Sequence, residues 1–287
     1  MITTTAPQQP RARQHAPPTP NDVALQLTGR DYLSYSAIST YQRCPLKYYF
    51  SYIGGLAPEF VSSSLVFGGA IHSALEHHCR QVLEGAPHPS NDDLMAAYEQ
   101  AWRTETRAPV RFGKNESKES LQDLARRMLA AFQASEVSKL DSELLGVEEE
   151  LRAPIVHDCP DILGRLDLIT VSRSALRITD FKTSRSAWGN AKVEESSPQM
   201  LLYTELVRPL AEACGRPIEI EWIVLTKTKE PAVHRHTLQP ELHAVARTKA
   251  VIQRVWRAIE QAHFFPSPSA MSCSTCPYAR PCQQWEG

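Results

Sequence analysis

Long hydrophobic runs are missing from this sequence, since no stretch reaches about 18 consecutive apolar residues, the length that a membrane-spanning helix needs. The first residues also lack the apolar core of a secretion signal. An excess of one charge sign is missing too, because 31 Lys and Arg residues face 32 Asp and Glu residues, for a net charge of -1. These absences argue against membrane-spanning and polyanion-coating proteins. We expect a soluble, cytoplasmic protein whose basic surfaces are local.

A phosphate-binding loop of the form Gly-x-x-x-x-Gly-Lys-Ser/Thr is absent from the 287 residues, so we expect any ATP-driven motor to be a separate partner. At roughly 150 residues per domain, the length allows one large domain or two. The 7 cysteines are an odd number in a chain too large to need disulfide staples. Ligand or core thiols are therefore favoured over a disulfide framework.

The first 30 residues are rich in proline, threonine, glutamine and alanine. A segment of this composition buries too little apolar surface to offset its conformational entropy. We therefore predict a disordered Pro-rich tail over residues 1–30, followed by an ordered region over residues 31–287.

The ordered region changes its hydrophobic period along the chain. Apolar residues recur at helical spacing over residues 69–136, and at period two in the following segments. A later helix begins near Ser196-Ser197-Pro198, because proline suits the first helical position, and ends at Gly215. The remaining elements are predicted as strands Val147–Ile155, Ile162–Val171, Leu176–Thr183 and Ile218–Thr226, and helices Gln199–Cys214 and Leu242–Ala262. This order indicates an α/β core.

Asp180 and Lys182 lie two residues apart in the predicted strand Leu176–Thr183, so both project from one face together with Ile178. The preceding predicted strand carries Asp167. If the two strands pair antiparallel, two carboxylates and an ammonium meet. Carboxylate oxygens bind hard cations, and a cation beside a lysine suits hydrolysis of a phosphodiester. Because acidic-x-Lys triplets are common on exposed strands, only the coincidence of both acids carries weight.

Two pairs of residues add to this pattern. His72 and Glu76 are four residues apart in a predicted helix and share one face, and an imidazole beside carboxylates tilts metal preference toward Mn²⁺. Gln199 and Tyr203 repeat the spacing on a later helix and offer an amide and a phenol to a phosphate or to the lysine. Ordinary surface pairing and helix packing are the alternative interpretations of both pairs.

Together these residues form the pattern Gly68-x-x-x-His72-x-x-x-Glu76, Gly164-Arg165-Leu166-Asp167, Asp180-Phe181-Lys182 and Gln199-x-x-x-Tyr203. It resembles the RecB-type branch of the PD-(D/E)XK nuclease superfamily over roughly residues 33 to 287. The resemblance implies a restriction-endonuclease-like α/β fold, a mixed β-sheet flanked by helices. It further implies a single nuclease domain over residues 31–287, with a helical insertion at about residues 69–140 and a C-terminal cysteine cluster.

The resemblance also implies roles for individual residues. His72, Asp167 and Asp180 would bind Mg²⁺ or Mn²⁺, and Lys182 would be catalytic together with the two aspartates. Gln199 and Tyr203 belong to the downstream helix motif of this branch and join the catalytic set. Glu76 is an accessory residue. An accessory acid from the first strand, Glu149 or Glu150, ranks below Asp167.

Cysteines are clustered near the C-terminus as Cys273-x-x-Cys276 and Cys282, whereas Cys44 lies at the other end of the ordered region. Thiolates alone permit either zinc or an iron–sulfur cluster, but a zinc site of four cysteines commonly uses two Cys-x-x-Cys pairs. The one-plus-three arrangement is similar to that of AddB-like and CRISPR-adaptation nucleases, which implies a 4Fe-4S cluster, with Zn²⁺ as the alternative. Either metal would clip the ends of the domain together.

The expected activity is that of a metal-dependent DNA nuclease, an exonuclease in repair, recombination or related DNA processing, acting on single-stranded DNA or DNA ends. A helicase or recombination protein is the expected partner. Tyrosines and phenylalanines at residues 41–52 could stack bases, and a basic track could follow phosphates. The alternatives are a non-catalytic DNA-binding scaffold subunit and a thiol redox sensor. The candidate track comprises Lys227, Lys229, Arg235, Arg247, Lys249, Arg254 and Arg257.

Overall fold

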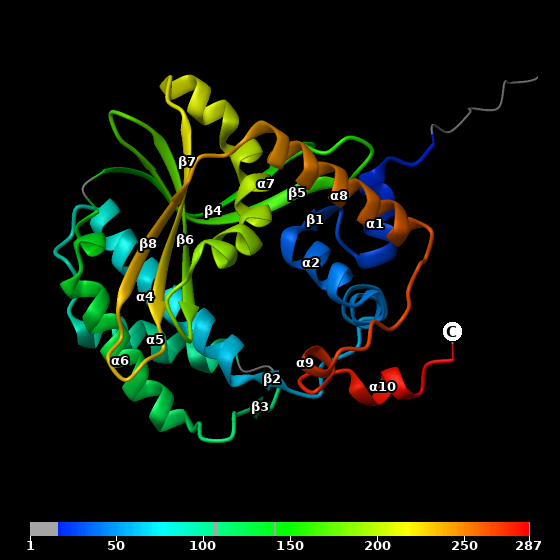
Figure 1. Cartoon of the computed structure of the whole chain (residues 1–287), viewed down its shortest axis with the longest axis horizontal. Coiled ribbons are helices and arrows are strands. Elements are labelled where there is room, and N and C mark those ends of the chain that lie inside the picture. The colour runs from blue at the N-terminus through cyan, green and yellow to red at the C-terminus, as the bar shows by residue number, and fades with distance from the viewer. Residues whose placement is uncertain (1–16, 106–107, 141, 287) are drawn as a thin grey trace, which may run out of the picture.

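The computed structural model describes residues 17–105, 108–140 and 142–286, in which helices cover both faces of a twisted sheet (Figure 1). Its strands are β1 (Tyr32–Ser34), β2 (Val61–Ser62), β3 (Val110–Arg111), β4 (Glu143–Ala153), β5 (Asp161–Val171), β6 (Leu176–Ser184), β7 (Ile218–Thr226) and β8 (Val233–Leu238). Its helices are α1 (Pro20–Thr28), α2 (Tyr35–Arg43), α3 (Pro45–Tyr48), α4 (Ser63–Leu83), α5 (Asn91–Glu105), α6 (Lys118–Ala134), α7 (Asn190–Cys214), α8 (Leu242–Glu260), α9 (Ala270–Cys273) and α10 (Ala279–Gln283). Short π and 3-10 helical turns occupy Tyr49–Ile53 and Glu136–Lys139.

The main sheet is mixed, with strand order β1-β5-β6-β7-β8 and β4 on the free edge of β5. β5 pairs antiparallel with β4 and β6, whereas β6 and β7 run parallel. A parallel pair needs a long crossover connection, and α7 supplies it. The predicted mixed sheet flanked by helices is therefore confirmed.

The sheet separates two hydrophobic cores. One face is covered by α1, α2, α7 and α8, and its largest fully buried side chains include Trp222 and Trp256. The other face is covered by α4, α5 and α6, around Phe67 and Phe132. Ile178 belongs to the first core and Phe181 to the second, as the alternation of a strand requires.

The strands β5 and β6 fork near the middle of β5. Their ladder runs from Val171↔Leu176 to Leu168↔Thr179, and β1 pairs with β5 only from Asp161 to Leu163. Residues 164–167 therefore pair with neither β1 nor β6. The fork thus opens the ladder on this edge of β5 at the position of Asp167.

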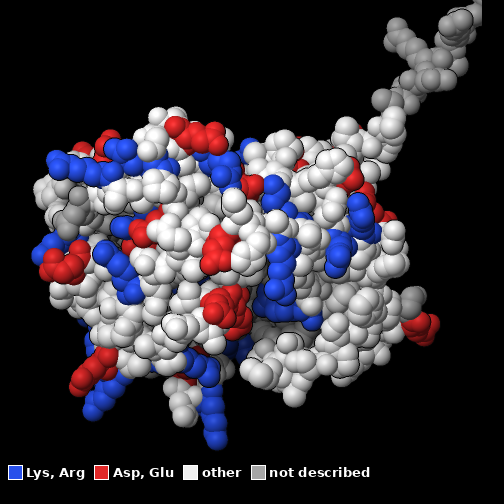
Figure 2. All heavy atoms as spheres, turned by 45° about the horizontal axis from the view of Figure 1, so that its top comes forward, with Lys and Arg blue, Asp and Glu red and all other residues white. Residues whose placement is uncertain are grey.

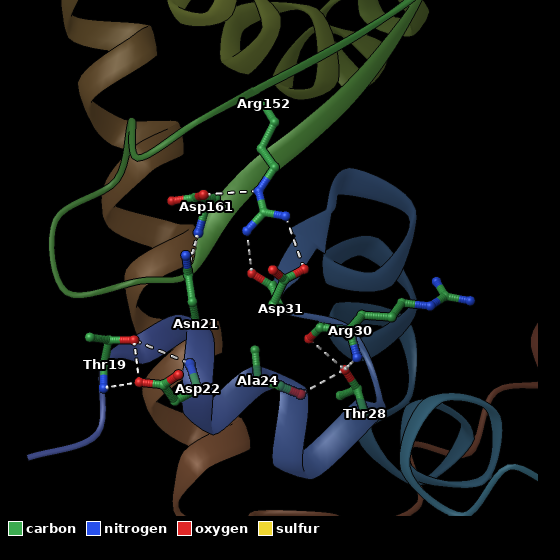
Figure 3. Close-up of polar contacts among 9 residues, drawn as sticks. All are labelled: Thr19, Asn21, Asp22, Ala24, Thr28, Arg30, Asp31, Arg152 and Asp161. Atoms are coloured by element: carbon green, nitrogen blue, oxygen red, sulfur yellow. Dashed lines mark hydrogen bonds and ion pairs between the residues drawn. The ribbon is translucent and has the colours of Figure 1, made fainter.

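The first helix corrects the predicted tail of residues 1–30. α1 begins with a capping box between Thr19 and Asp22, and its Ala24 is completely buried in the core. Arg152 on β4 forms ion pairs with Asp31 and Asp161, and the backbone N–H of Asp161 donates to Asn21 (Figure 3). These tertiary contacts override the composition of residues 20–30, whereas residues 1–16 lie outside the described part of the chain.

α7 begins at Asn190, well before the predicted start at Pro198. Proline cannot donate to the carbonyl of Glu194, but the Ser197 hydroxyl donates to that oxygen at 2.8 Å instead. The helix therefore continues through Pro198 and ends at Gly215 as predicted, with φ of 62° at that glycine. Among the described helices, none combines the length and apolar character needed to cross a bilayer.

Candidate active site

The fork between β5 and β6 brings Asp167 and Asp180 together. Leu166 is buried in one core and Leu168 in the other, although a regular strand would place residues two apart on one face. The alternation of β5 is thus broken at Asp167. The Asp167 carboxylate turns into the fork and accepts a hydrogen bond from the Phe181 backbone N–H at 2.7 Å.

His72 reaches the fork from α4. The Ser62 side chain caps this helix, and Phe67, Ile71 and Leu75 anchor it in the core. Because His72 follows Ile71 by one residue, about 100° around the helix, its ring lies at the edge of the buried stripe. Its Nδ1 lies 3.2 Å from Oδ2 of Asp167.

Glu148 completes a set of possible metal ligands that the sequence did not reveal. Ligand atoms of His72, Glu148 and Asp167 all lie within 4.8 Å of one another. Glu148 adopts φ of 54° between Val147, which pairs with Leu168, and Glu149, which pairs with Leu166. This left-handed conformation is costly for a residue with a side chain, and here it coincides with the break in β5.

The predicted accessory acids lie elsewhere. Glu149 and Glu150 are exposed, and Glu150 accepts a hydrogen bond from Arg165 at 3.2 Å. The backbone irregularity turns their neighbour Glu148 toward Asp167 instead, so the structure favours Glu148 over Glu149 or Glu150 as the accessory acid. Glu76 shares a helix face with His72, but its carboxylate is paired with Arg80 at 2.8 Å.

Lys182 lies over the carboxylate of Asp180 on β6. Its Nζ is 2.7 Å from Oδ1, to which it donates, and 2.6 Å from Oδ2. Oδ2 of Asp180 is buried and is paired with the Lys182 ammonium. The neighbouring donor set, an imidazole from His72 and carboxylates from Glu148 and Asp167, fits a bound divalent cation.

The charges within the fork depend on one another. Burial opposes ionisation of Asp167, but the His72 imidazole beside it, followed by Lys182 and the Phe181 N–H, holds the pKa of Asp167 below its ordinary value. Burial and the charge of Asp167 raise the pKa of Asp180 despite Lys182. Burial also opposes the charge of Lys182, yet the carboxylates of Asp180 and Asp167 raise its pKa. The fork therefore gathers negative charge that a cation would stabilise.

Gln199 and Tyr203 approach the fork from α7. Nε2 of Gln199 donates to the Tyr203 hydroxyl at 3.4 Å, and burial raises the pKa of the phenol. Gly164 makes this approach possible, since a Cβ at that position would lie 2.8 Å from Cε1 of Tyr203 and 2.6 Å from Leu206. The two residues thus lie beside the predicted carboxylates and Lys182.

The predicted cysteine ligands also come together. Cys44, Cys276 and Cys282 pack around Leu46, Phe50 and Tyr278, and the backbone N–H of Leu46 donates to Phe265. Burial raises the pKa of Cys282, and the thiols of Cys44, Cys276 and Cys273 add to the effect. Of the remaining thiols, Cys79 and Cys159 are buried in the cores.

Two predictions about nucleic-acid contacts hold only for some of their residues. Tyr41, Tyr48 and Phe50 are at most 7% exposed, so these three are core residues and cannot stack bases, whereas Tyr49 and Tyr52 are partly exposed. Two members of the predicted basic track are neutralised, because Lys249 pairs with Glu205 and Arg235 with Glu221. Lys and Arg mix with Asp and Glu over the face in Figure 2, where a band of Lys and Arg runs toward a hollow near its middle.

Glu148→Gln is expected to stabilise the metal-free protein near pH 8 and to weaken its stabilisation by Mn²⁺. Burial, with the charges of Asp167 and Glu76, raises the pKa of Glu148 to about 7. The folded state therefore holds this proton more tightly, and stability falls as pH rises from about 4.5 to about 7. Glutamine does not ionise, so the variant avoids this fall in stability. It also lacks the carboxylate that would bind the metal.

Thermal unfolding with EDTA or MnCl₂, near pH 5 and pH 8, measures both effects. The variant should match the wild type near pH 5 without metal, and the exposed Glu150→Gln should behave as wild type throughout. An undiminished gain in Tm from Mn²⁺ in Glu148→Gln would exclude Glu148 as a ligand.

Comparisons with known proteins concern the family and the fold. A family model described as the PD-(D/E)XK nuclease superfamily matches residues 32–283. The crystal structure of a candidate exonuclease from Eubacterium rectale aligns with a TM-score of 0.55 at 12% identity, covering 89% of this chain and 88% of that chain. The structure of SSO0001 aligns with a TM-score of 0.39 at 14% identity, covering 87% of this chain and 95% of that chain. No curated protein matches significantly. At such identity, the first likeness shows the fold alone.

Proposed function

The chain belongs to the PD-(D/E)XK nuclease superfamily, and we propose that it is a divalent-metal-dependent deoxyribonuclease that degrades DNA from ends during repair, recombination or related processing. The observation that carries this proposal is the fork at Asp167, where His72 and Glu148 converge on one side and Asp180 with Lys182 on the other. The candidate exonuclease with the same fold supports it further.

Mg²⁺ or Mn²⁺ is the proposed cofactor, held by His72, Asp167 and Asp180, with Glu148 as an added ligand. When bound, the cation supplies charge stabilisation of the scissile phosphate and activation of water. An imidazole in the donor set favours Mn²⁺ relative to a site of oxygen atoms alone. The Phe181 N–H holds the Asp167 carboxylate in place by donating to its Oδ2.

Lys182 is the proposed catalytic lysine. Its raised pKa keeps it protonated near neutral pH, so it acts as a donor and not as a general base. As an ammonium it can orient the attacking water and offset charge that develops on the phosphate. Asp180 fixes its position through the 2.7 Å hydrogen bond to Oδ1.

Gln199 and Tyr203 are proposed to contact the substrate phosphate next to Lys182. The hydrogen bond between them orients the phenol, and the contact of Gly164 with Tyr203 sets how closely α7 approaches β5. Burial keeps the phenol protonated, so it can donate a hydrogen bond. Assignment to the RecB-type branch is part of the same proposal.

Cys44, Cys273, Cys276 and Cys282 are proposed to hold a 4Fe-4S cluster. The donor set consists of thiols that lie near one another. One cysteine followed much later by three matches the arrangement that the resemblance associates with such a cluster, and Zn²⁺ is the alternative at the same thiols. Either metal would tie the N- and C-terminal parts of the domain together.

The alternative function is that of a DNA-binding scaffold subunit in a helicase–nuclease or CRISPR-adaptation-like complex. A scaffold does not require two buried carboxylates facing each other, which cost stability unless a cation is bound. The buried Asp180 beside Asp167 therefore favours the enzyme. A separate helicase or recombination protein remains the proposed partner.

Incubation of anaerobically purified protein with end-labelled single- and double-stranded DNA, in Mg²⁺ or Mn²⁺, tests the proposal. We expect a ladder of shortened products that appears only with metal and starts at an end. A closed circular duplex should resist cleavage, which separates an exonuclease from an endonuclease. Binding of DNA without cleavage in every metal would favour the scaffold.

A further inference from the structure

A cationic hollow of about 560 Å³ lies at the end of the sheet formed by the C-termini of β6 and β7. Its wall is built from α4, α6 and the turn after β7, with Phe67, Leu121 and Leu124 as apolar lining. The polar residues that line it are Ser64, Asn115, Glu116, Ser120, Arg127, Arg185, Lys227, Thr228 and Lys229. The proposed metal ligands do not line this hollow.

Positive charge dominates the hollow. Four cations, Arg127, Arg185, Lys227 and Lys229, face one carboxylate, Glu116, which leaves a formal excess of three positive charges. Glu116 is already engaged, because its Oε2 accepts from the Ser63 hydroxyl at 2.6 Å and from the Gly113 N–H at 3.0 Å. Within the described chain, no carboxylate forms an ion pair with the side chain of Lys227, Arg185 or Lys229.

Lys227 is the central cation of this hollow. It is half-buried, and its Nζ lies 4.8 Å from the centre of the Phe67 ring. Its backbone N–H donates to Ser184, which ties the ends of β6 and β7 together. Burial lowers the pKa of Lys227, although Glu116 opposes the effect. A half-buried ammonium without an ion-pair partner is costly, so an anion bound here would be stabilised.

The hollow and the proposed active site lie along one side of α4. Ser64, Gly68 and His72 are spaced four residues apart, so they share a helix face over about 12 Å. Gly68 faces Thr183, the residue after Lys182, and Arg185 directly follows the end of β6 at Ser184. One nucleic-acid strand advances about 3.4 Å per nucleotide along a duplex. A strand bound at the fork could therefore reach the hollow within a few nucleotides.

We propose that this hollow is a binding site for the terminal phosphate monoester of a DNA strand, so that the protein selects phosphorylated ends. The inference rests on the proposed nuclease function. A terminal monoester carries about −1.5 to −2 charges near neutral pH, whereas an internal phosphodiester carries −1. The excess of three positive charges matches the monoester better. Serine hydroxyls and the Asn115 amide can bind its remaining oxygens.

The test compares otherwise identical DNA substrates that end in a 5′-phosphate, a 3′-phosphate or hydroxyls. Cleavage rates with Mn²⁺, and binding by fluorescence anisotropy with EDTA, are measured for the wild type, Lys227→Met and Arg185→Gln. Methionine keeps the packing on Phe67, and Arg185 is exposed, so both variants should fold. Arg216→Gln, near the start of β7, is the matched control at the opposite end of that strand.

We expect the wild type to prefer one phosphorylated end about tenfold or more, and each hollow variant to lose most of that preference while still cutting hydroxyl-ended DNA. Inorganic phosphate should compete with the phosphorylated end. Equal cleavage and binding of all ends by an active wild type would overturn the inference and leave the nuclease intact. Equal losses on every substrate would assign the hollow to internal phosphodiesters and also overturn it. If no substrate is cut, the nuclease proposal fails, and the binding preference alone decides for or against the hollow.

Discussion

Asp180→Asn is expected to lower the rate of DNA cleavage by at least about 10²-fold while leaving the metal-free fold no less stable than the wild type. Asparagine keeps the shape of the side chain but removes the charge that would bind the cation and hold Lys182. Burial and the charge of Asp167 raise the pKa of Asp180. At pH values above the ordinary carboxyl pKa, the ionised Asp180 therefore lowers the stability of the folded protein. Its removal should therefore not lower stability near neutral pH.

Lys182→Met should lose a similar factor in cleavage rate, but with a different effect on stability. It leaves the buried Asp180 carboxylate without its ammonium, which we expect to lower the free energy of unfolding by up to about 3 kcal/mol near pH 8. The loss should shrink toward acid pH, where Asp180 can take up a proton.

Single-turnover cleavage and thermal unfolding at several pH values measure both variants, with Lys192→Met as an exposed control. Lys192 pairs with Glu195 on the surface of α7. Wild-type cleavage rates in Asp180→Asn would remove Asp180 from the proposed site. Equal stability changes in Asp180→Asn and Lys182→Met would contradict the charge arrangement derived for the fork.

Cys276→Ser is expected to release the proposed cluster and to unfold at a markedly lower temperature. The four cysteines connect residue 44 with residues 273–282, so the closed loop spans most of the ordered chain. In the chain-entropy model, a cross-link that closes a loop of about 100 residues raises the free energy of unfolding by up to about 4.7 kcal/mol. A longer loop raises it slightly more. Loss of the cross-link should also loosen α9 and α10, because the hydrophobic cluster that holds this region is small.

Iron and zinc analysis, visible absorbance and thermal unfolding of anaerobically purified protein measure this effect, with Cys214→Ser as the control. Cys214 ends α7 and lies outside the group formed by Cys44, Cys276 and Cys282. Retention of zinc without iron in the wild type would select the zinc alternative. An unchanged Tm in Cys276→Ser would show that the thiols do not clip the domain.

Much of the fold could be predicted because its signals are local. The period-two segments predicted β5, β6 and β7 to within one residue at each end, since burial on a sheet face repeats every second residue. The positive φ at Gly215 ended α7 where the sequence placed its stop. The edge strand β8 was missed, because alternating polar residues such as His234 and His236 hide its pattern.

Other features depend on contacts between distant parts of the chain. Asn21 is bonded to Asp161 of strand β5, 140 residues later, and Ala24 is buried in the core, so the composition of the first 30 residues could not reveal α1. Pro198 lies inside α7, since the Ser197 hydroxyl satisfies the carbonyl that proline leaves free. In both cases, tertiary packing outweighs local propensity.

For the candidate site, local patterns in the sequence indicated most of the residues that we propose carry the chemistry. Asp180 and Lys182 share a strand face, and His72 is placed by the helical period of its neighbours, because side-chain direction follows from local geometry. How these residues meet depends on the pairing of the strands. The fork of β5 from β6 turns Asp167 inward, and the left-handed backbone at Glu148 selects that acid over Glu149 and Glu150. A strand break depends on which neighbouring strands pair and where they separate, and no single segment encodes that pairing.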